Sequence, residues 1–338
     1  MYVKSAFVLS LLLAFSARSD DLYGPTLGIV PDTRGSALRP IRGIPGAATI
    51  GDAVDLGPDA ASIAIAPRQS RAIVMTGSGV RLVFIQPDGT LSSTDAGMPA
   101  SFQPAAIGFS PSGSIAALYD ASTSAVWLSG GKAVRVDTRP LPDTIDLLAV
   151  SDRTESLIAG TLRSGGDSVF ILDGKGAYKA LAGFKNVTDL TFLGASGDLA
   201  VCDSGAKQIL LIRDAFSNGA AEMVLDLSGS AEAPLRIASS MDGSLLAVLA
   251  SGAPPPDPTR RRTTEAGRVS IRHTNVVGLL RIADRQWTAI ECHCAATELA
   301  PLTGNAVFRL TQRTDQPLWI LDSDGAAPRL VFIPAVRP

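Results

Sequence analysis

Histidine and cysteine are scarce in this chain of 338 residues, which contains only two histidines and three cysteines. A serine–histidine–acid triad needs a histidine, and the sequence has no Gly-x-Ser-x-Gly turn to present such a serine. A phosphate-binding loop with its lysine is missing as well. The sequence therefore identifies no catalytic residue and leaves enzymatic activity open, and it predicts no cofactor and no complete set of metal ligands.

An excess of charge of one sign and long apolar runs are also lacking. The chain has 30 lysines and arginines against 32 aspartates and glutamates, which gives a formal net charge of −2. Because nucleic-acid-binding domains usually carry a clear basic excess, we expect no nucleic acid partner. After the first residues, no stretch approaches the roughly 18 apolar residues of a membrane-spanning helix, so we expect no membrane span.

The first 19 residues have the layout of a secretory signal peptide. Lys4 supplies a basic start, residues 6–15 (AFVLSLLLAF) form a short apolar run, and residues 17–19 (ARS) place small residues at a cleavage site. The apolar run is too short to cross a membrane comfortably. We therefore expect residues 1–19 to be removed, leaving a soluble mature protein of residues 20–338 that is secreted or periplasmic.

What the sequence does contain is a repeat of strand-like segments. Its 32 glycines and 22 prolines favour many short elements joined by turns, and no window keeps helical apolar spacing over three turns. Six segments share a short apolar strand, a second strand rich in Ala, Val and Leu, a third apolar strand and a more polar fourth. Matching apolar positions are Ile63, Ile107, Leu148, Leu190, Leu235 and Leu299.

The spacing of these positions indicates the fold class. The successive intervals are 44, 41, 42, 45 and 64 residues, and four of the five are typical of a four-stranded propeller blade. The long interval contains residues 253–267 (APPPDPTRRRTTEAG), which we interpret as a loop inserted between two strands of one blade. A β-sandwich or a two-domain β protein has the same local strands but would not explain the period.

The two ends of the chain suggest how the ring closes. Residues 27–56 contain three further strand-like pieces, and we expect them to form a partial blade. Residues 329–335 (RLVFIPA) are expected to complete it, because a shared blade removes exposed sheet edges. The prediction is therefore an all-β fold, a single β-propeller of seven blades with four antiparallel strands each, with six or eight blades as alternatives.

Two local features are candidate sites. Cys292 and Cys294 flank His293, and strand alternation places the two thiols on one face. A disulfide within this segment, a disulfide from Cys202 to one of the pair, buried free thiols, and a metal or redox site all remain open. The second feature, Arg260, Arg261 and Arg262 in the predicted loop, is either an interaction site for an anionic partner or a solvated loop.

Residues 109–116 (FSPSGSIA) resemble the F-S-P-D-G-x-x-[IL]-A hairpin of bacterial WD40-like propellers, including the TolB-type and YVTN-type repeats. Residues 239–247 (SSMDGSLLA) are a second, weaker copy. Ser112 stands where these families usually have aspartate, and the Trp-Asp ending of true WD40 repeats is absent. The resemblance implies a propeller that acts as an interaction platform, and it carries over no catalytic residue.

These observations lead to three hypotheses about function. The first is an exported, non-enzymatic, monomeric propeller that binds a protein or glycan partner on one face. The second is a lactonase-like hydrolase with one metal ion in the central channel, held by acidic or amide side chains from several blades. The third is a thiol redox or metal-handling protein that uses the Cys-x-Cys segment.

Overall fold

The computed structural model describes most of residues 25–336. The ranges outside the description are 1–24, 33–35, 87–89, 100–101, 131–132, 154–156, 163–164, 182, 218, 231, 252–274 and 337–338. The predicted signal peptide, the predicted loop 253–267 and its three arginines Arg260, Arg261 and Arg262 therefore lie outside the described residues. Within the described ranges, no helix has the length and hydrophobicity needed to cross a membrane.

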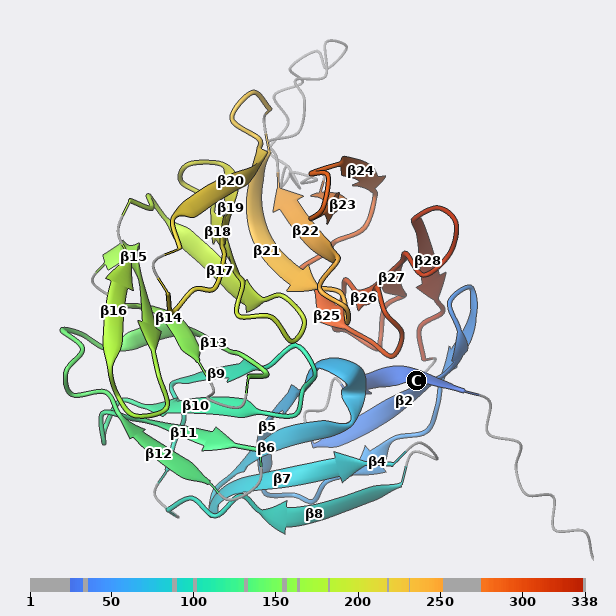
Figure 1. Cartoon of the computed structure of the whole chain (residues 1–338). Coiled ribbons are helices and arrows are strands. Elements are labelled where there is room, and N and C mark those ends of the chain that lie inside the picture. The colour runs from blue at the N-terminus through green and yellow to red at the C-terminus, as the bar shows by residue number, and fades with distance from the viewer. Residues whose placement is uncertain are drawn as a thin grey trace, which may run out of the picture.

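Seven four-stranded antiparallel sheets form a ring around a central axis (Figure 1). Blade 1 holds β1 (Thr26–Pro31), β2 (Ala37–Ile44), β3 (Ala47–Ile50) and β4 (Val54–Asp55). Blade 2 holds β5 (Ala60–Ile65), the 3-10 turn η1 (Pro67–Gln69), β6 (Arg71–Thr76), β7 (Gly79–Ile85) and β8 (Leu91–Asp95). Blade 3 holds β9 (Ala106–Phe109), β10 (Ala116–Asp120), β11 (Ala125–Ser129) and β12 (Val134–Asp137).

The other four blades follow the same order from the axis outward. Blade 4 holds β13 (Ile145–Val150), β14 (Ile158–Leu162), β15 (Gly165–Leu172) and β16 (Tyr178–Leu181). Blade 5 holds β17 (Val187–Phe192), β18 (Leu199–Asp203), β19 (Gln208–Ile212) and β20 (Ala221–Asp226). Blade 6 holds β21 (Ala233–Ser239), β22 (Leu245–Ser251), β23 (Asn275–Arg281) and β24 (Trp287–Cys292). Blade 7 holds β25 (Ala300–Pro301), β26 (Val307–Arg309), β27 (Leu318–Asp322) and β28 (Arg329–Ile333). The predicted all-β, seven-bladed propeller is confirmed.

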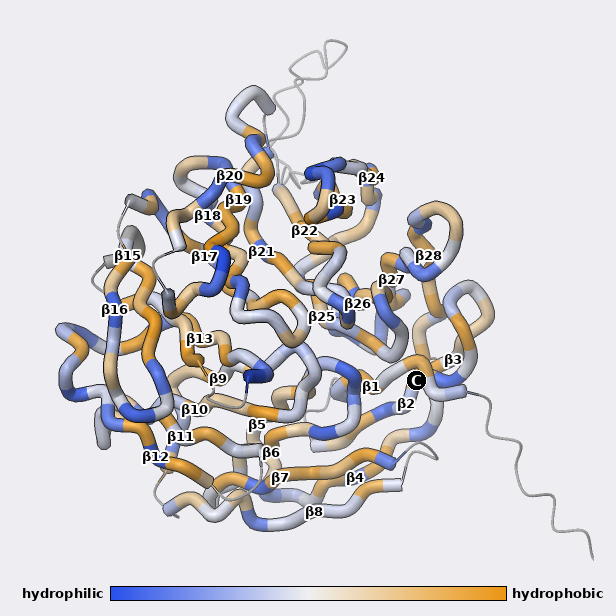
Figure 2. The backbone as a smooth tube through the Cα atoms, in the orientation of Figure 1, coloured by the Kyte–Doolittle hydropathy of each residue, from blue (hydrophilic) through white to orange (hydrophobic). Residues whose placement is uncertain are grey.

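Burial along the strands explains why the second strand of a repeat is apolar and the fourth is more polar. The second strands β10 and β18 are buried at every position, because each sheet has a neighbouring blade against both of its faces. The outer strands β8 and β16 alternate or are largely exposed, and they carry the polar residues. Figure 2 shows this division, with hydrophobic segments concentrated within the blades and hydrophilic ones at many of the connecting turns.

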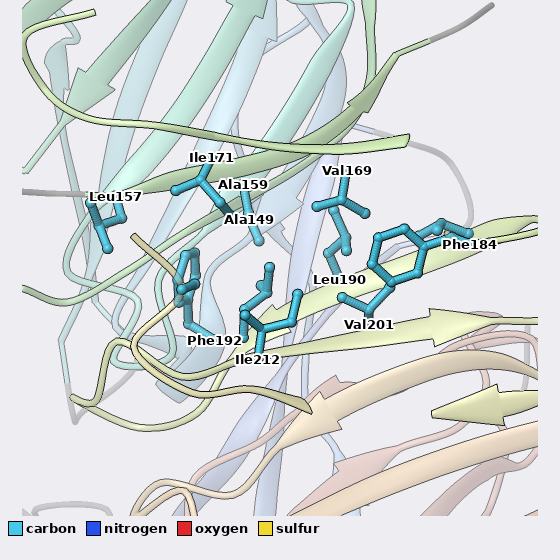
Figure 3. Packing of buried hydrophobic residues seen from close by; sticks show 13 residues of the cluster. Ala149, Leu157, Ala159, Val169, Ile171, Phe184, Leu190, Phe192, Val201 and Ile212 are labelled. Carbon is cyan, nitrogen blue, oxygen red and sulfur yellow. The ribbon is translucent and has the colours of Figure 1, made fainter. Parts of the chain in front are cut away.

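The hydrophobic core lies between blades rather than at one centre. Between blades 4 and 5, Ala159 and Ile171 of one sheet face Leu190, Phe192 and Val201 of the next (Figure 3). Similar clusters lie at the other blade interfaces, including the one between the last blade and the first. A single blade therefore cannot bury its own apolar faces, and the closed ring is the stable unit.

The prediction for ring closure is wrong. Strand β28 is the outer strand of blade 7 and pairs with β27, so the C-terminal chain does not complete blade 1. Residues 300–333 supply all four strands of blade 7, although the inner strand β25 is only two residues long. In blade 1, β3 and β4 both pair with β2, so the N-terminal segment forms its sheet unaided.

Packing and hydrogen bonds close the ring in place of a shared blade. Leu27 and Ile41 of blade 1 pack against Leu302, Val307 and Ile320 of blade 7. The Thr303 N–H donates to the Leu27 carbonyl at 2.9 Å, and the Arg309 guanidinium donates to the Ile29 carbonyl at 3.1 Å. Blades 1 and 7 accordingly lie side by side although they come from opposite ends of the chain (Figure 1).

A buried glutamine in η1 adds hydrogen bonds across the junction between blades 1 and 7, which we call the seam. The Gln69 side-chain oxygen accepts the Ile29 N–H at 2.9 Å, and its Nε2 donates to the Pro301 carbonyl at 2.8 Å. Its neighbour Arg68 donates through Nη1 to the Gly304 carbonyl at 2.8 Å. Blade 2 is thereby joined to both blade 1 and blade 7 at the point where the ring closes.

Close approach of the inner strands leads to a prediction at Gly108. A Cβ on Gly108 of β9 would lie 2.4 Å from the Leu148 carbonyl oxygen of β13 in the next blade. We expect Gly108→Ala to lower the free energy of unfolding by about 1–3 kcal/mol, because backbone must move to remove the overlap. Gly77→Ala is the control, since a Cβ there meets nothing within 4 Å. Urea denaturation of both variants measures the difference, and equal stabilities would contradict the close approach.

Candidate binding site

A large cavity formed by described residues lies where the inner strands of blades 4, 5 and 6 begin. It has a volume of about 1130 Å³. We call this cavity the mouth pocket. It is lined by Asp146, Leu147, Asn186, Val187, Thr188, Leu235, Arg236, Leu249, Ser251, Asn275, Cys292, His293, Cys294, Ala295, Ala296 and Thr297. They come from the starts of β13, β17 and β21, from the ends of β22 and β24, and from the connection into blade 7.

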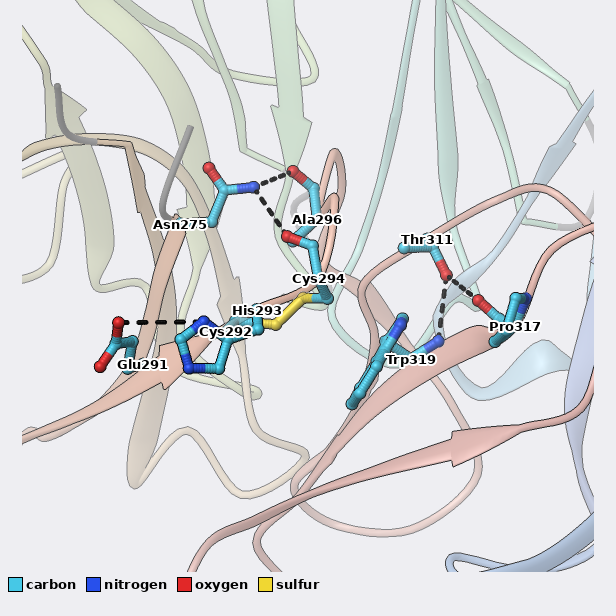
Figure 4. Close-up of a disulfide and its surroundings, with 9 residues drawn as sticks. All are labelled: Asn275, Glu291, Cys292, His293, Cys294, Ala296, Thr311, Pro317 and Trp319. Atoms are coloured by element: carbon cyan, nitrogen blue, oxygen red, sulfur yellow. Dashed lines mark hydrogen bonds and ion pairs between the residues drawn. A yellow bond between two sulfur atoms is a disulfide. The ribbon is translucent and has the colours of Figure 1, made fainter. Parts of the chain in front are cut away.

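Hydrogen bonds hold the wall of the mouth pocket in place. The Asn275 amide donates to the Ala296 carbonyl at 2.9 Å and to the Cys294 carbonyl at 3.5 Å (Figure 4). The Arg236 guanidinium donates to the Thr188 carbonyl at 3.1 Å, which links blades 5 and 6. These hydrogen bonds to backbone carbonyls fix the positions of the Asn275 and Arg236 side chains.

A disulfide between Cys292 and Cys294 forms part of this wall (Figure 4). Their Cα atoms are 5.0 Å apart, and both side chains are buried. His293 between them is 81% exposed, with its Nδ1 3.9 Å from a Glu291 carboxylate oxygen. The Cys-x-Cys segment therefore presents an exposed imidazole at the pocket and keeps its sulfur atoms inside.

Cys202 lies apart from the other two cysteines. It is buried in β18, where the Thr188 hydroxyl donates to its Sγ at 3.3 Å. Burial raises the pKa of the Cys202 thiol to about 12, so the reactive thiolate is not populated at neutral pH. The structure thus places two of the three candidate thiol residues in the mouth pocket and the third in the core.

The described residues that flank the predicted loop on either side both line the mouth pocket. Ser251 at the end of β22 and Asn275 at the start of β23 both line it. The chain between them, including Arg260, Arg261 and Arg262, lies outside the described residues.

Behind the mouth pocket lies a second cavity, the central channel, with a volume of about 440 Å³. Inner-strand residues of several blades line it, and its charged residues are Asp189, Glu298 and Arg309. Arg309 Nε donates to Glu298 Oε1 at 2.7 Å, and the Gln312 amide donates to the other carboxylate oxygen at 2.6 Å. Glu298 and Arg309 therefore neutralise each other.

Asp189 lies in the channel wall without such a partner. Its two carboxylate oxygens accept the backbone N–H groups of Leu190 and Ile237, each at 2.9 Å. Asp189 is half-buried and is among the residues that line the channel. Burial raises the pKa of Asp189 to about 6, although the two N–H bonds and the nearby Arg236 favour the charged form.

Sequence reasoning missed the charged channel residues, although the repeat contained a sign of two of them. Asp189 and Glu298 each stand one position before the matching apolar residue of the repeat. Other segments have Ser62, Ala106 and Leu147 at that position. These carboxylates were therefore visible in the aligned segments, although the strand registers place Arg236 of β21 at the position equivalent to Asp189.

The lactonase-like hypothesis requires acidic or amide side chains that converge on one metal ion. In the part of the chain that the structure describes, no group of three or more His, Cys, Asp or Glu residues is placed to hold a metal. The channel carboxylates are instead engaged as described, Glu298 by Arg309 and Asp189 by backbone N–H groups.

The ring of seven blades around this channel places the chain among the β-propellers. No protein-family model matches the sequence, and no curated protein matches it. Among solved structures, a functionally unknown protein from Desulfotomaculum acetoxidans is similar with a TM-score of 0.56 and 14% identity, over 92% of this chain and 100% of that one. The periplasmic gluconolactonase of Pseudomonas aeruginosa has a TM-score of 0.55 and 14% identity, over 92% and 98%. A streptogramin B lyase has a TM-score of 0.51 and 11% identity, over 88% and 90%. At these identities the likeness concerns the fold alone.

Proposed function

We propose that this chain is an exported, non-enzymatic β-propeller that binds an extended segment of a protein partner in the mouth pocket. The observation that carries the proposal is the cavity of about 1130 Å³ on one face, assembled from several blades. Concave sites of this size, with a few polar groups among apolar ones, are the usual places for ligands. Export is proposed from residues 1–19 alone, which lie outside the described residues.

The chemistry of the lining favours a peptide over a sugar. The lining holds amides, hydroxyls, one guanidinium, one carboxylate and one imidazole beside aliphatic side chains, and no Phe, Tyr or Trp is among its described residues. Protein sites for sugar rings commonly use an aromatic side chain as a stacking surface. An extended peptide needs hydrogen-bonding groups and small apolar pockets, which this lining offers.

A pair of substitutions at opposite ends of one strand tests the site. Leu235 near the start of β21 lines the mouth pocket and is 36% exposed, while Met241 follows the end of that strand and is 50% exposed. Peptides selected on the wild-type protein from a phage-displayed random library are the probe. We expect Leu235→Asp to weaken their binding about tenfold or more, because it places a charge on an apolar contact. Met241→Asp should bind them as the wild type does.

The same experiment separates the other outcomes. Selected peptides that bind Leu235→Asp and the wild type equally would show that the mouth pocket is not the binding site. If no peptide is selected, and an array of glycans is bound instead, the protein-partner proposal is wrong. Isothermal titration calorimetry gives the affinities, and circular dichroism checks that both variants keep the β-sheet fold.

A further inference from the structure

We propose that the central channel is a binding site for a primary ammonium group, with the Asp189 carboxylate as its anchor. This inference goes beyond the proposed function, because it concerns the channel and holds whether or not a protein occupies the mouth pocket. It depends on three features of the described residues, which are the balance of charge in the channel, the setting of Asp189 and the way into the cavity.

The charge of the channel is unbalanced. Glu298 and Arg309 form an ion pair, with side chains only 16% and 5% exposed. Asp189 is the third charged residue of the lining, and no described lysine, arginine or histidine forms an ion pair with it. With Asp189 ionised, the charges of the described channel lining sum to −1, and Arg236 of the mouth pocket favours this charge without forming an ion pair with it. A cation in the channel gains more from this charge than it would in bulk water.

The backbone presents the Asp189 carboxylate in one orientation. The register of β17 shifts between Val187 and Asp189, so the strand is irregular where this side chain leaves it. The Leu190 N–H comes from the same blade and the Ile237 N–H from the next, which fixes both oxygens across a blade interface. Each oxygen keeps a second lone pair, and an ammonium group can donate to these without displacing a bond already made.

In this proposal, the route of an alkylammonium to this carboxylate passes through the mouth pocket. Consecutive residues line the two cavities in turn: Thr188 lines the mouth pocket and Asp189 the channel, and Thr297 lines the mouth pocket and Glu298 the channel. The two cavities therefore adjoin along β17 and at the entrance to blade 7. A volume of about 440 Å³ accommodates a short alkyl chain with its ammonium head.

Protonation of Asp189 gives the site a defined pH dependence. The described ionisable groups on the neighbouring strands are Arg236 on β21, Asp146 on β13, and Asp203 and the neutral Cys202 thiol on β18. Because its pKa is about 6, the free carboxyl is ionised at neutral pH and becomes neutral as the pH falls through that value. A ligand that binds only the ionised form should therefore bind about tenfold more weakly at about pH 5 than at about pH 7.5.

The test uses n-butylammonium as the probe and n-butanol as its uncharged counterpart of matching shape. Carboxyl-carbon NMR follows Asp189 in the wild-type protein, with and without each compound. We expect butylammonium to lower the pKa of Asp189 and to bind about tenfold more weakly at the lower pH, while butanol changes neither. An unchanged Asp189 pKa in saturating butylammonium, or equal effects of the two compounds, would overturn the proposal.

Two variants supply an independent readout. Asp189→Asn should lose butylammonium binding, because the amide keeps the shape of the side chain and removes its charge. Asp173→Asn is the matched control, since Asp173 Oδ1 also accepts two backbone N–H groups, those of Lys175 and Ala177, at a turn between β15 and β16. Butylammonium that binds Asp189→Asn and Asp173→Asn equally contradicts the proposal. If Asp189→Asn does not fold, the NMR titration of Asp189 in the wild-type protein tests the proposal by itself.

Discussion

Arg309→Met is expected to lower the free energy of unfolding by about 3–5 kcal/mol, because it leaves Glu298 as an unpaired charge inside the channel. The Arg309 and Glu298 side chains are only 5% and 16% exposed, so water cannot replace the lost partner well. The substitution also removes the bond to the Ile29 carbonyl in blade 1. Since no strand is shared across the seam between blades 7 and 1, this contact has a larger part in closing the ring than it would in a propeller with a shared blade.

Arg313→Met is the control for this prediction. Arg313 pairs with Asp315 in the same blade, but their side chains are 65% and 47% exposed, and such pairs contribute about 1 kcal/mol or less. The double variant Arg309→Met with Glu298→Gln should recover part of the lost stability, because no buried charge is left unpaired. Urea denaturation gives all the values. A loss at Arg309 no greater than that at Arg313 would show that the seam does not depend on this ion pair.

The second large effect is expected at Phe192, which packs between blades 4 and 5 (Figure 3). Phe192 is 1% exposed and is surrounded by apolar side chains of both sheets. Phe192→Ala should lower the free energy of unfolding by about 3–5 kcal/mol, through lost burial and the cavity left behind. Because each blade buries its faces only against its neighbours, this cost is a property of the interface between blades.

Phe216 in the same blade supplies the comparison. It is 37% exposed, and Phe216→Ala should cost less than about 1 kcal/mol. Thermal and urea unfolding of the two variants, measured side by side, test the claim. Similar losses at the two positions would mean that the interfaces between blades do not carry the stability of the ring.

The repeat, and with it the fold class, was accessible from the sequence. The spacing of about 42 residues between Ile63, Ile107, Leu148 and Leu190 predicted blades of four strands, and the structure has seven. This works because the pattern of a blade is local: short apolar strands and turns follow one another along the chain, and their period is recorded in the order of the residues.

The candidate site was accessible only in part. Cys292 and Cys294 were singled out from the sequence, but several pairings of the three cysteines remained open until the structure joined these two and placed Cys202 in the core. Nothing local connects Asp146, Thr188 and Arg236, which come from three blades and meet in one pocket.

The sequence by itself determined that the chain forms repeated four-stranded sheets, because apolar periodicity acts over a few residues. The tertiary structure alone decided how the ring closes and what lies along its axis. Strand β28 stays in blade 7, and Asp189, Glu298 and Arg309 line one channel only because the ring brings blades 5 and 7 to a common axis. Such relations depend on contacts between residues far apart in the chain, and no local pattern records them.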